Sequence, residues 1–221
     1  MSSSYTIQNS SANQVELKRT TAESDILVMI EGSWLESQIA SKQCQWNTGI
    51  KFLNHMIQII CRRASLNIDV EFKTVIDSTY AGHVVWEDVG MALGAGIAEL
   101  MSKRRDDGVE GAGFGAACID EALSKCCLSF EGRAGCFIKI AESEASKREL
   151  VEDAKCQDAR QFFEGFAQGA RCTLHLEINK AFDTHHLWES AFRAFGQALQ
   201  VSLQSNPWRK GVIVGVKDVI D

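Results

Sequence analysis

The stretch DTHHLWESAF, residues 183–192, places two adjacent histidines shortly before a glutamate. In a helix, Glu189 follows His185 by four residues and His186 by three, which brings the three side chains towards one face. Imidazole nitrogens and a carboxylate gathered in this way are suitable ligands for a divalent metal ion. The same side chains also suit a hydrogen-bonded polar patch on the surface. This stretch alone leaves both interpretations open.

A similar arrangement occurs earlier in the chain. Identical residues recur at a constant offset of 102 positions, in the pairs His83/His185, Trp86/Trp188, Glu87/Glu189, Ala92/Ala194 and Gly94/Gly196. Chance would give about one identity in so short a window, so an internal duplication is inferred. Each half then carries one His-x-x-x-Glu at the start of a helix, and two copies favour the metal-site interpretation over the polar patch.

The hydrophobic pattern predicts the order strand, helix, strand, helix in each half. In the first half, strands are expected over residues 26–32 and 66–76, and helices over residues 48–64 and 86–105. In the second half, strands are expected within residues 126–140 and 173–178, and helices over residues 158–172 and 188–204. A glycine-rich link over residues 106–117 would join them. His83 and His185 lie just before helices, where rigid elements hold ligands in a fixed geometry.

These elements predict an α+β fold of two similar halves, each a small mixed sheet with two helices on one face. The repeats are expected over about residues 15–106 and 107–221. Residues 1–14 are rich in Ser, Asn and Gln, which predicts a disordered tail.

Composition narrows the classes of protein to consider. A net charge of −6 argues against binding to nucleic acid, which normally requires a basic surface. No run of eighteen apolar residues and no amino-terminal signal segment occur, so we expect a cytoplasmic protein with no membrane partner. Eight cysteines form no CxxC pair and are expected to be buried, reduced thiols. A metal ion would then be held by nitrogen and oxygen ligands.

The chain resembles the imidazoleglycerol-phosphate dehydratase family from about Val15 to Ile220. The matching stretches, in order, are RTTAESDI, NTGIKFLNHM, HVVWEDVGMALG, IDEAL, EGRA, TLH, HHLWESAFRAF and VKDVI. The resemblance implies helices packed between two sheets. It also implies an enzyme of histidine biosynthesis that removes water from imidazole glycerol phosphate to give imidazole acetol phosphate.

The resemblance further implies a manganese enzyme, with one or two ions per chain. Position by position, the implied ligands are His55, His83, Glu87, His175, His185, His186 and Glu189. All five histidines of the chain fall on ligand positions, whereas histidines placed for packing alone would scatter. In the family the ligands come from both repeats and from neighbouring subunits, which implies a homo-oligomer, a shell built of trimers.

The remaining site residues are also carried over from the family. Glu23 matches its catalytic glutamate, a general acid or base, although a glutamate at the start of a strand is ordinarily just exposed. Arg133 and Lys217 match residues that bind the substrate phosphate, and Arg193 stands where the family usually has lysine. Solvated surface charges are the alternative for these three.

Several positions depart from the family pattern, and three of them concern metal and phosphate binding. Val84 replaces a metal ligand, while Gly111 and Gly215 replace an arginine and a serine that bind phosphate. Each lost charge-assisted hydrogen bond weakens phosphate binding by about 1.5–3 kcal/mol. These departures leave two alternatives to the dehydratase: a paralogue acting on a related imidazole compound, and a non-catalytic metal-binding scaffold.

Overall fold

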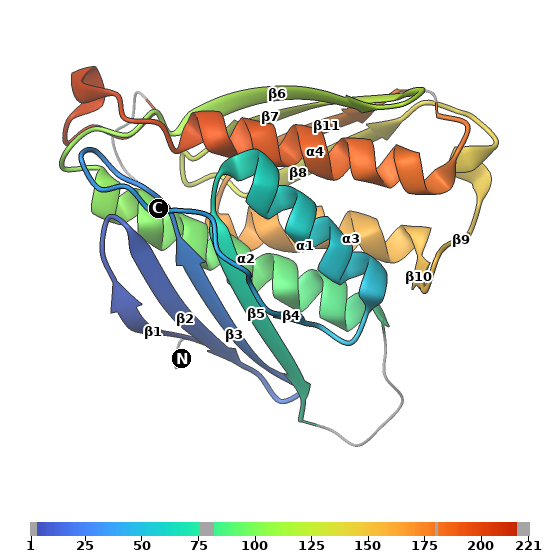
Figure 1. The fold of residues 1–221 in the computed structure, drawn as a ribbon, viewed down its shortest axis with the longest axis horizontal. Coiled ribbons are helices and arrows are strands. Elements are labelled where there is room, and N and C mark those ends of the chain that lie inside the picture. Colours follow the sequence, from blue (N-terminus) through green and yellow to red (C-terminus); the bar gives the residue numbers. More distant parts are fainter. Residues whose placement is uncertain (1–3, 76–81, 180, 216–221) are drawn as a thin grey trace.

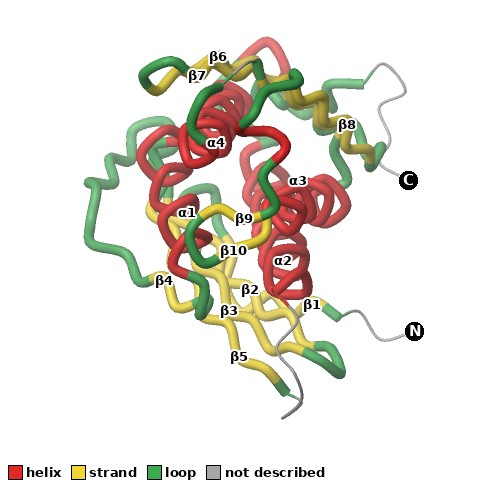
Figure 2. The backbone as a smooth tube through the Cα atoms, turned by 90° about the vertical axis from the view of Figure 1, so that its right-hand side faces the viewer, coloured by secondary structure: helices red, strands yellow, loops and turns green. Residues whose placement is uncertain are grey.

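Two β-sheets enclose a layer of helices in the computed structural model, which describes residues 4–75, 82–179 and 181–215 (Figure 1). The first sheet has the strand order β1-β2-β3-β5-β4 and the second has the order β6-β7-β11-β8. Viewed from the side, the four long helices of the described residues lie between the two sheets (Figure 2). The expected α+β fold, with helices packed between sheets, is confirmed.

The two halves repeat one topology. The first comprises β2 (Gln14–Thr20), β3 (Ser24–Glu31), β4 (Trp46–Asn47), α1 (Lys51–Ala64), β5 (Asn67–Thr74) and α2 (Gly82–Arg104). The second comprises β6 (Ala112–Ile119), β7 (Ala122–Ser129), β8 (Gly135–Ile140), α3 (Cys156–Ala170), β11 (Thr173–Ile178) and α4 (Thr184–Ser202). In each half an antiparallel hairpin pairs with a third antiparallel strand, and a parallel strand completes the order. The helix α1 follows the parallel strand β4 directly, whereas residues 141–155, which include a short hairpin, separate the parallel strand β8 from α3.

The amino-terminal prediction is wrong for part of its range. Tyr5–Ser10 forms strand β1, which pairs antiparallel with β2. The side chains of β1 are mostly exposed, so backbone hydrogen bonds to β2 hold it in place more than burial does. A strand of this kind has no hydrophobic alternation that the sequence could display.

The prediction of a glycine-rich link over residues 106–117 is also wrong in part, because its second half belongs to β6. A Cβ atom on Gly113 would lie 2.0 Å from the carbonyl oxygen of Ala198, and one on Gly115 would lie 2.2 Å from that of Ala194. Both glycines therefore let α4 approach the strand closely. Glycine serves close packing here and not flexibility.

Glycines also bring α2 and α3 together. A Cβ on Gly90 or Gly94 of α2 would lie 2.3 Å from a carbonyl oxygen of α3. Conversely, a Cβ on Gly165 or Gly169 of α3 would lie 2.2 or 2.1 Å from a carbonyl oxygen of α2. The two helices come from different halves, so this contact joins the halves at backbone distance.

Arg104, at the end of α2, connects three parts of the fold. It is 2% exposed, and its guanidinium donates to the carbonyl oxygens of Ala12 (2.8 Å), Gly32 (3.0 Å) and Leu203 (3.3 Å). It also lies over the ring of Trp34, 4.8 Å from the centroid. Burial lowers the pKa of Arg104 to about 10. The side chain thus connects the residues just before β2 and just after β3 to the end of α4.

The eight cysteines are free thiols, but they are not uniformly buried. Cys118 and Cys127 are exposed because they lie on the outer face of the second sheet, where alternate residues point away from the helices. None of the helices in the described ranges is long and apolar enough to cross a membrane.

Candidate metal centre

The site is built on the start of α4. The carboxylate of Asp183 caps this helix by accepting the backbone N–H groups of His185 (2.7 Å) and His186 (3.2 Å). Asp183 is a favoured residue at this position because it satisfies amides that have no partner within the helix. The cap fixes where the histidine pair enters the first turn.

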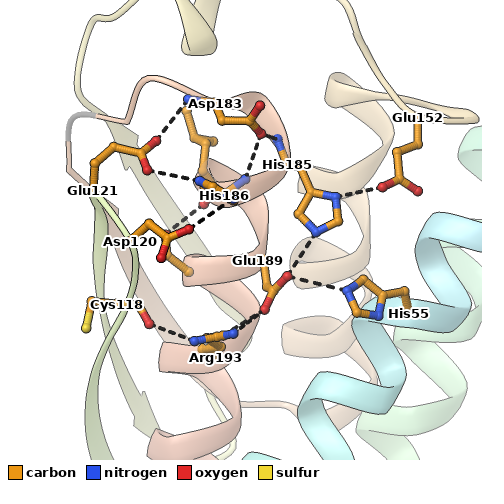
Figure 3. A network of polar contacts seen from close by, with 12 residues as sticks. His55, Cys118, Asp120, Glu121, Glu152, Asp183, His185, His186, Glu189 and Arg193 are labelled. Carbon is orange, nitrogen blue, oxygen red and sulfur yellow. Dashed lines mark hydrogen bonds and ion pairs between the residues drawn. The ribbon is translucent and has the colours of Figure 1, made fainter.

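His185 and Glu189 meet His55 of α1 (Figure 3). The Nε2 atom of His185 lies 2.9 Å from Oε2 of Glu189, and Nε2 of His55 lies 3.4 Å from the same oxygen. The Glu189 side chain is only 6% exposed, whereas those of His55 and His185 are 36% and 30% exposed. The carboxylate is therefore the buried member of the cluster, and the two imidazoles are partly exposed to solvent. One potential metal ligand comes from the first half and two come from the second.

The second oxygen of Glu189 is held by Arg193, one turn along α4. Nε of Arg193 donates to Oε1 at 2.8 Å, and its NH1 group donates to the carbonyl oxygen of Cys118 at 2.9 Å. Burial raises the pKa of Glu189, but hydrogen bonds from His185 and Arg193 outweigh burial and keep it below its ordinary value. Arg193 was predicted to bind phosphate, but in this structure its guanidinium binds Oε1 of Glu189. The other oxygen, Oε2, therefore faces the two histidines.

His186 departs from the expected common face. Its Nδ1 atom lies 2.9 Å from Oε2 of Glu121, and its Nε2 atom lies 3.6 Å from Oδ2 of Asp120. Glu121 also accepts the backbone N–H groups of Phe182 and Asp183, and with His186 these donors lower the pKa of Glu121 to about 2. Hydrogen bonding to Glu121 raises the pKa of His186. His186 therefore belongs to a second group, beside the first.

On its outer side His185 contacts the short hairpin of β9 (Leu150–Val151) and β10 (Ala154–Lys155). Nδ1 of His185 lies 2.6 Å from Oε1 of Glu152, which occupies the turn of this hairpin. The next residue, Asp153, accepts the backbone N–H groups of Lys51 (2.7 Å) and Phe52 (2.9 Å) at the start of α1.

Three other predicted ligands lie outside both groups. His83 and Glu87 are in the first turns of α2, exposed and half-buried respectively. His175 is exposed on the outer face of β11 and stacks on Phe137, with ring centroids 4.7 Å apart. Within the described part of a single chain, none of the three joins a cluster of ligand atoms.

Glu23 and Arg133, predicted to act in catalysis and in phosphate binding, lie outside the cluster, whereas Arg193 contacts it through Glu189. Glu23 is exposed in the turn before β3, and Arg133 is exposed in the turn between β7 and β8. Among the residues that the structure describes, neither side chain joins His55, His185 and Glu189. Lys217 lies outside the described residues.

Sequence reasoning missed Glu121, Glu152 and Asp153. Glu121 lies in IDEAL, one of the stretches that resemble the family, so a signal for it was present. Glu152 and Asp153 carried no signal, because only the folded hairpin brings them to α4 and α1.

The donor set of His55, His185 and Glu189 fits a divalent cation. Imidazole nitrogen and carboxylate oxygen without thiolate suit Mn²⁺ or a similar borderline ion. The facing atoms, Nε2 of each histidine and Oε2 of Glu189, lie within 4.8 Å of one another. Among the described residues, this cluster supplies three of the six ligands that an octahedral ion takes.

Comparisons with known proteins identify the family and the fold. The family model described as imidazoleglycerol-phosphate dehydratase matches residues 48–199. A relative of that name from Methylococcus capsulatus is 30% identical, over 93% of this chain and 97% of its own. Another from Cyberlindnera jadinii is 35% identical, over 80% of this chain and 78% of its own. The crystal structure of imidazoleglycerol-phosphate dehydratase from Staphylococcus aureus has the same fold, with a TM-score of 0.71 at 23% identity over 87% of this chain and 99% of that chain. The chain belongs to the imidazoleglycerol-phosphate dehydratase family.

Proposed function

We propose that this protein is a metal-dependent dehydratase of histidine biosynthesis, which converts imidazole glycerol phosphate to imidazole acetol phosphate in the cytoplasm. The observation that carries the proposal is the convergence of His55, His185 and Glu189, from both halves, around one carboxylate oxygen. Membership of the family supports the choice of substrate. The proposed ion is Mn²⁺, at one or two per chain.

The residues of the chain have distinct tasks in this proposal. His55, His185 and Glu189 hold the ion, and Arg193 keeps Glu189 ionised and oriented. When bound, a divalent ion supplies a Lewis acid for the imidazole ring of the substrate. Dehydration removes a proton from one carbon and hydroxide from its neighbour, so a carboxylate is needed to move the proton. Glu23 is proposed for that step.

We propose a homo-oligomer, a shell built of trimers, in which neighbouring subunits complete the coordination shell with His83, Glu87, His175 and His186. A row of exposed residues across the second sheet supports this proposal. Phe114, Cys127, His175 and Phe137 are register partners on adjacent strands, and both phenylalanines are more than half exposed. A broad apolar row around a candidate ligand suits a protein interface.

Arg133 and Lys217 are the proposed phosphate ligands. Gly111 lacks the charge of the family's arginine, and the guanidinium of Arg193 is engaged by Glu189. These two observations favour a second candidate function, the dehydration of a related imidazole alcohol without a phosphate group.

The test is an assay for water loss from imidazole glycerol phosphate, with Mn²⁺ present and bound metal quantified by elemental analysis. We expect turnover at one or two ions per chain. Glu23→Gln is the informative variant, because loss of the titrating carboxylate should abolish turnover and leave metal content unchanged. Bound metal without turnover on either the phosphorylated or the unphosphorylated alcohol would support the scaffold alternative.

Val84→His is expected to raise the affinity for Mn²⁺ by about tenfold, or ~1.4 kcal/mol, because it restores a ligand beside His83. Val84 is half-buried in the first turn of α2, so an imidazole there can reach the surface. Titration of Mn²⁺ against both proteins measures the change, with Val84→Leu as the control for side-chain volume. Equal affinities for all three proteins would mean that position 84 does not face an ion.

A further inference from the structure

The turn at residues 152 and 153 touches both helices that carry the metal-ligand candidates. Asp153 supplies the cap that α1 otherwise lacks, since its own N-cap residue, Ile50, makes no side-chain hydrogen bond and its first turn holds no acidic residue. Glu152 contacts the imidazole of His185 on α4. Consecutive carboxylates therefore bridge α1 and α4 at the end where His55 and His185 face each other, with ring centroids 5.4 Å apart.

The turn itself is firmly held. Val151 and Ala154, which flank it, are register partners in the β9–β10 hairpin, and they are 4% and 5% exposed. Glu152 has a φ of 50°, a left-handed conformation that favours glycine. A non-glycine residue in this region is strained and is retained where surrounding contacts determine its conformation. A glycine at position 152 would suit this φ better, but it could not make the side-chain contact to His185.

We propose that the 152–153 turn positions the metal centre, with Glu152 as a positioning residue for His185 and Asp153 as a positioning residue for α1 and His55. Without an ion, Nε2 of His185 donates to Glu189. When His185 binds an ion, Glu152 would accept the hydrogen bond from Nδ1–H, so that the lone pair of the neutral ring is on Nε2. That atom faces Oε2 of Glu189, 2.9 Å away. The inference rests on the proposed metal dependence. It adds a role for Glu152 and Asp153, which are not among the proposed metal ligands.

The chemistry of imidazole explains why this contact matters. A neutral imidazole has one protonated nitrogen and one nitrogen with a lone pair, and the hydrogen bond made by the first decides which atom can bind a metal. A carboxylate in this position also makes the ligating nitrogen more basic. His186 has the same arrangement, with its Nδ1 atom 2.9 Å from Glu121, so both members of the histidine pair present Nε2 outward from a carboxylate.

The experiment measures Mn²⁺ dissociation constants of the full chain by electron paramagnetic resonance of the free ion. Glu152→Gly removes the carboxylate and suits the positive φ, so we expect affinity to fall about 10–100-fold while the thermal unfolding midpoint does not fall. Glu152→Gln retains an oxygen that can accept from Nδ1–H, and an intermediate affinity is expected. Asp153→Ala is expected to weaken binding and to lower the midpoint, because it uncaps α1. Glu149→Gln, exposed on the same segment, is the control and should match the wild type.

The outcomes separate this inference from the proposed function. Wild-type affinity in Glu152→Gly overturns the positioning role, whatever the dehydratase activity of the wild type. A loss of affinity that parallels a fall in the unfolding midpoint of Glu152→Gly also overturns it, because the residue would then act on folding. Weakened binding in Glu152→Gly, in a wild type that binds Mn²⁺ but releases no water, supports the inference and contradicts the dehydratase. A wild type without Mn²⁺ affinity contradicts both.

Discussion

Glu189→Gln is expected to reduce dehydratase turnover at least about a thousandfold, or ~4 kcal/mol in activation free energy, and to remove most bound Mn²⁺. Oε2 of Glu189 is the only atom that both Nε2 of His55 and Nε2 of His185 face in the cluster. An uncharged amide cannot balance the charge of a divalent ion at this buried position, where the native side chain is 6% exposed. Activity assays combined with elemental analysis measure both effects.

The fold of this variant is expected to survive, because a glutamine oxygen can still accept from Arg193. Circular dichroism and the oligomeric state, compared with those of the wild type, check this point. Glu177→Gln, an exposed neutralisation on β11, is the matched control for loss of one negative charge. Full Mn²⁺ content in Glu189→Gln would place the ion elsewhere.

Arg104→Met is expected to lower the free energy of unfolding by about 3–5 kcal/mol, although the residue is remote from the metal centre. The substitution keeps apolar volume but leaves the carbonyl oxygens of Ala12, Gly32 and Leu203 without their donor. Each buried acceptor left in this state costs about 1–3 kcal/mol, partly offset because the cation no longer has to be desolvated.

Urea unfolding at a fixed protein concentration measures the change, and the fixed concentration keeps any contribution from subunit association constant. Lys103→Met is the control, because Lys103 is 45% exposed and forms only a surface ion pair with Glu99. A change within about 0.5 kcal/mol is expected for the control. An Arg104→Met protein as stable as this control would show that water satisfies the carbonyl groups.

Hydrophobic periodicity was sufficient to predict the four long helices and the strands β3, β5, β7, β8 and β11, because these elements bury apolar residues against the core. The helix α1 is an example, with Leu53, Met56, Ile57 and Ile60 all buried at helical spacing. Periodicity was not sufficient for β1, whose side chains are mostly exposed. It was misleading for β6, where Gly113 and Gly115 signal a link locally but serve the approach of α4.

Residue types and the family resemblance were sufficient to predict some of the site residues but not their contacts. The duplicated His-x-x-x-Glu pointed to His185 and Glu189, and the resemblance added His55, which α1 brings to them. The direction of His186 could not be predicted, because it depends on Glu121 across the sheet edge. The role of Glu152 depends on a hairpin turn that approaches α4 only in the folded chain.

The interlocked glycines of α2 and α3 bear on how such a chain could have originated. Each half supplies one of these helices, and α1 and α4 form the corresponding contact between halves. A polypeptide the size of one half would expose the apolar side of its helical layer to water, with nothing to cover it. A single-copy precursor would therefore have needed a second copy to cover this layer, and fusion of two such copies would turn a subunit interface into the interior of one molecule.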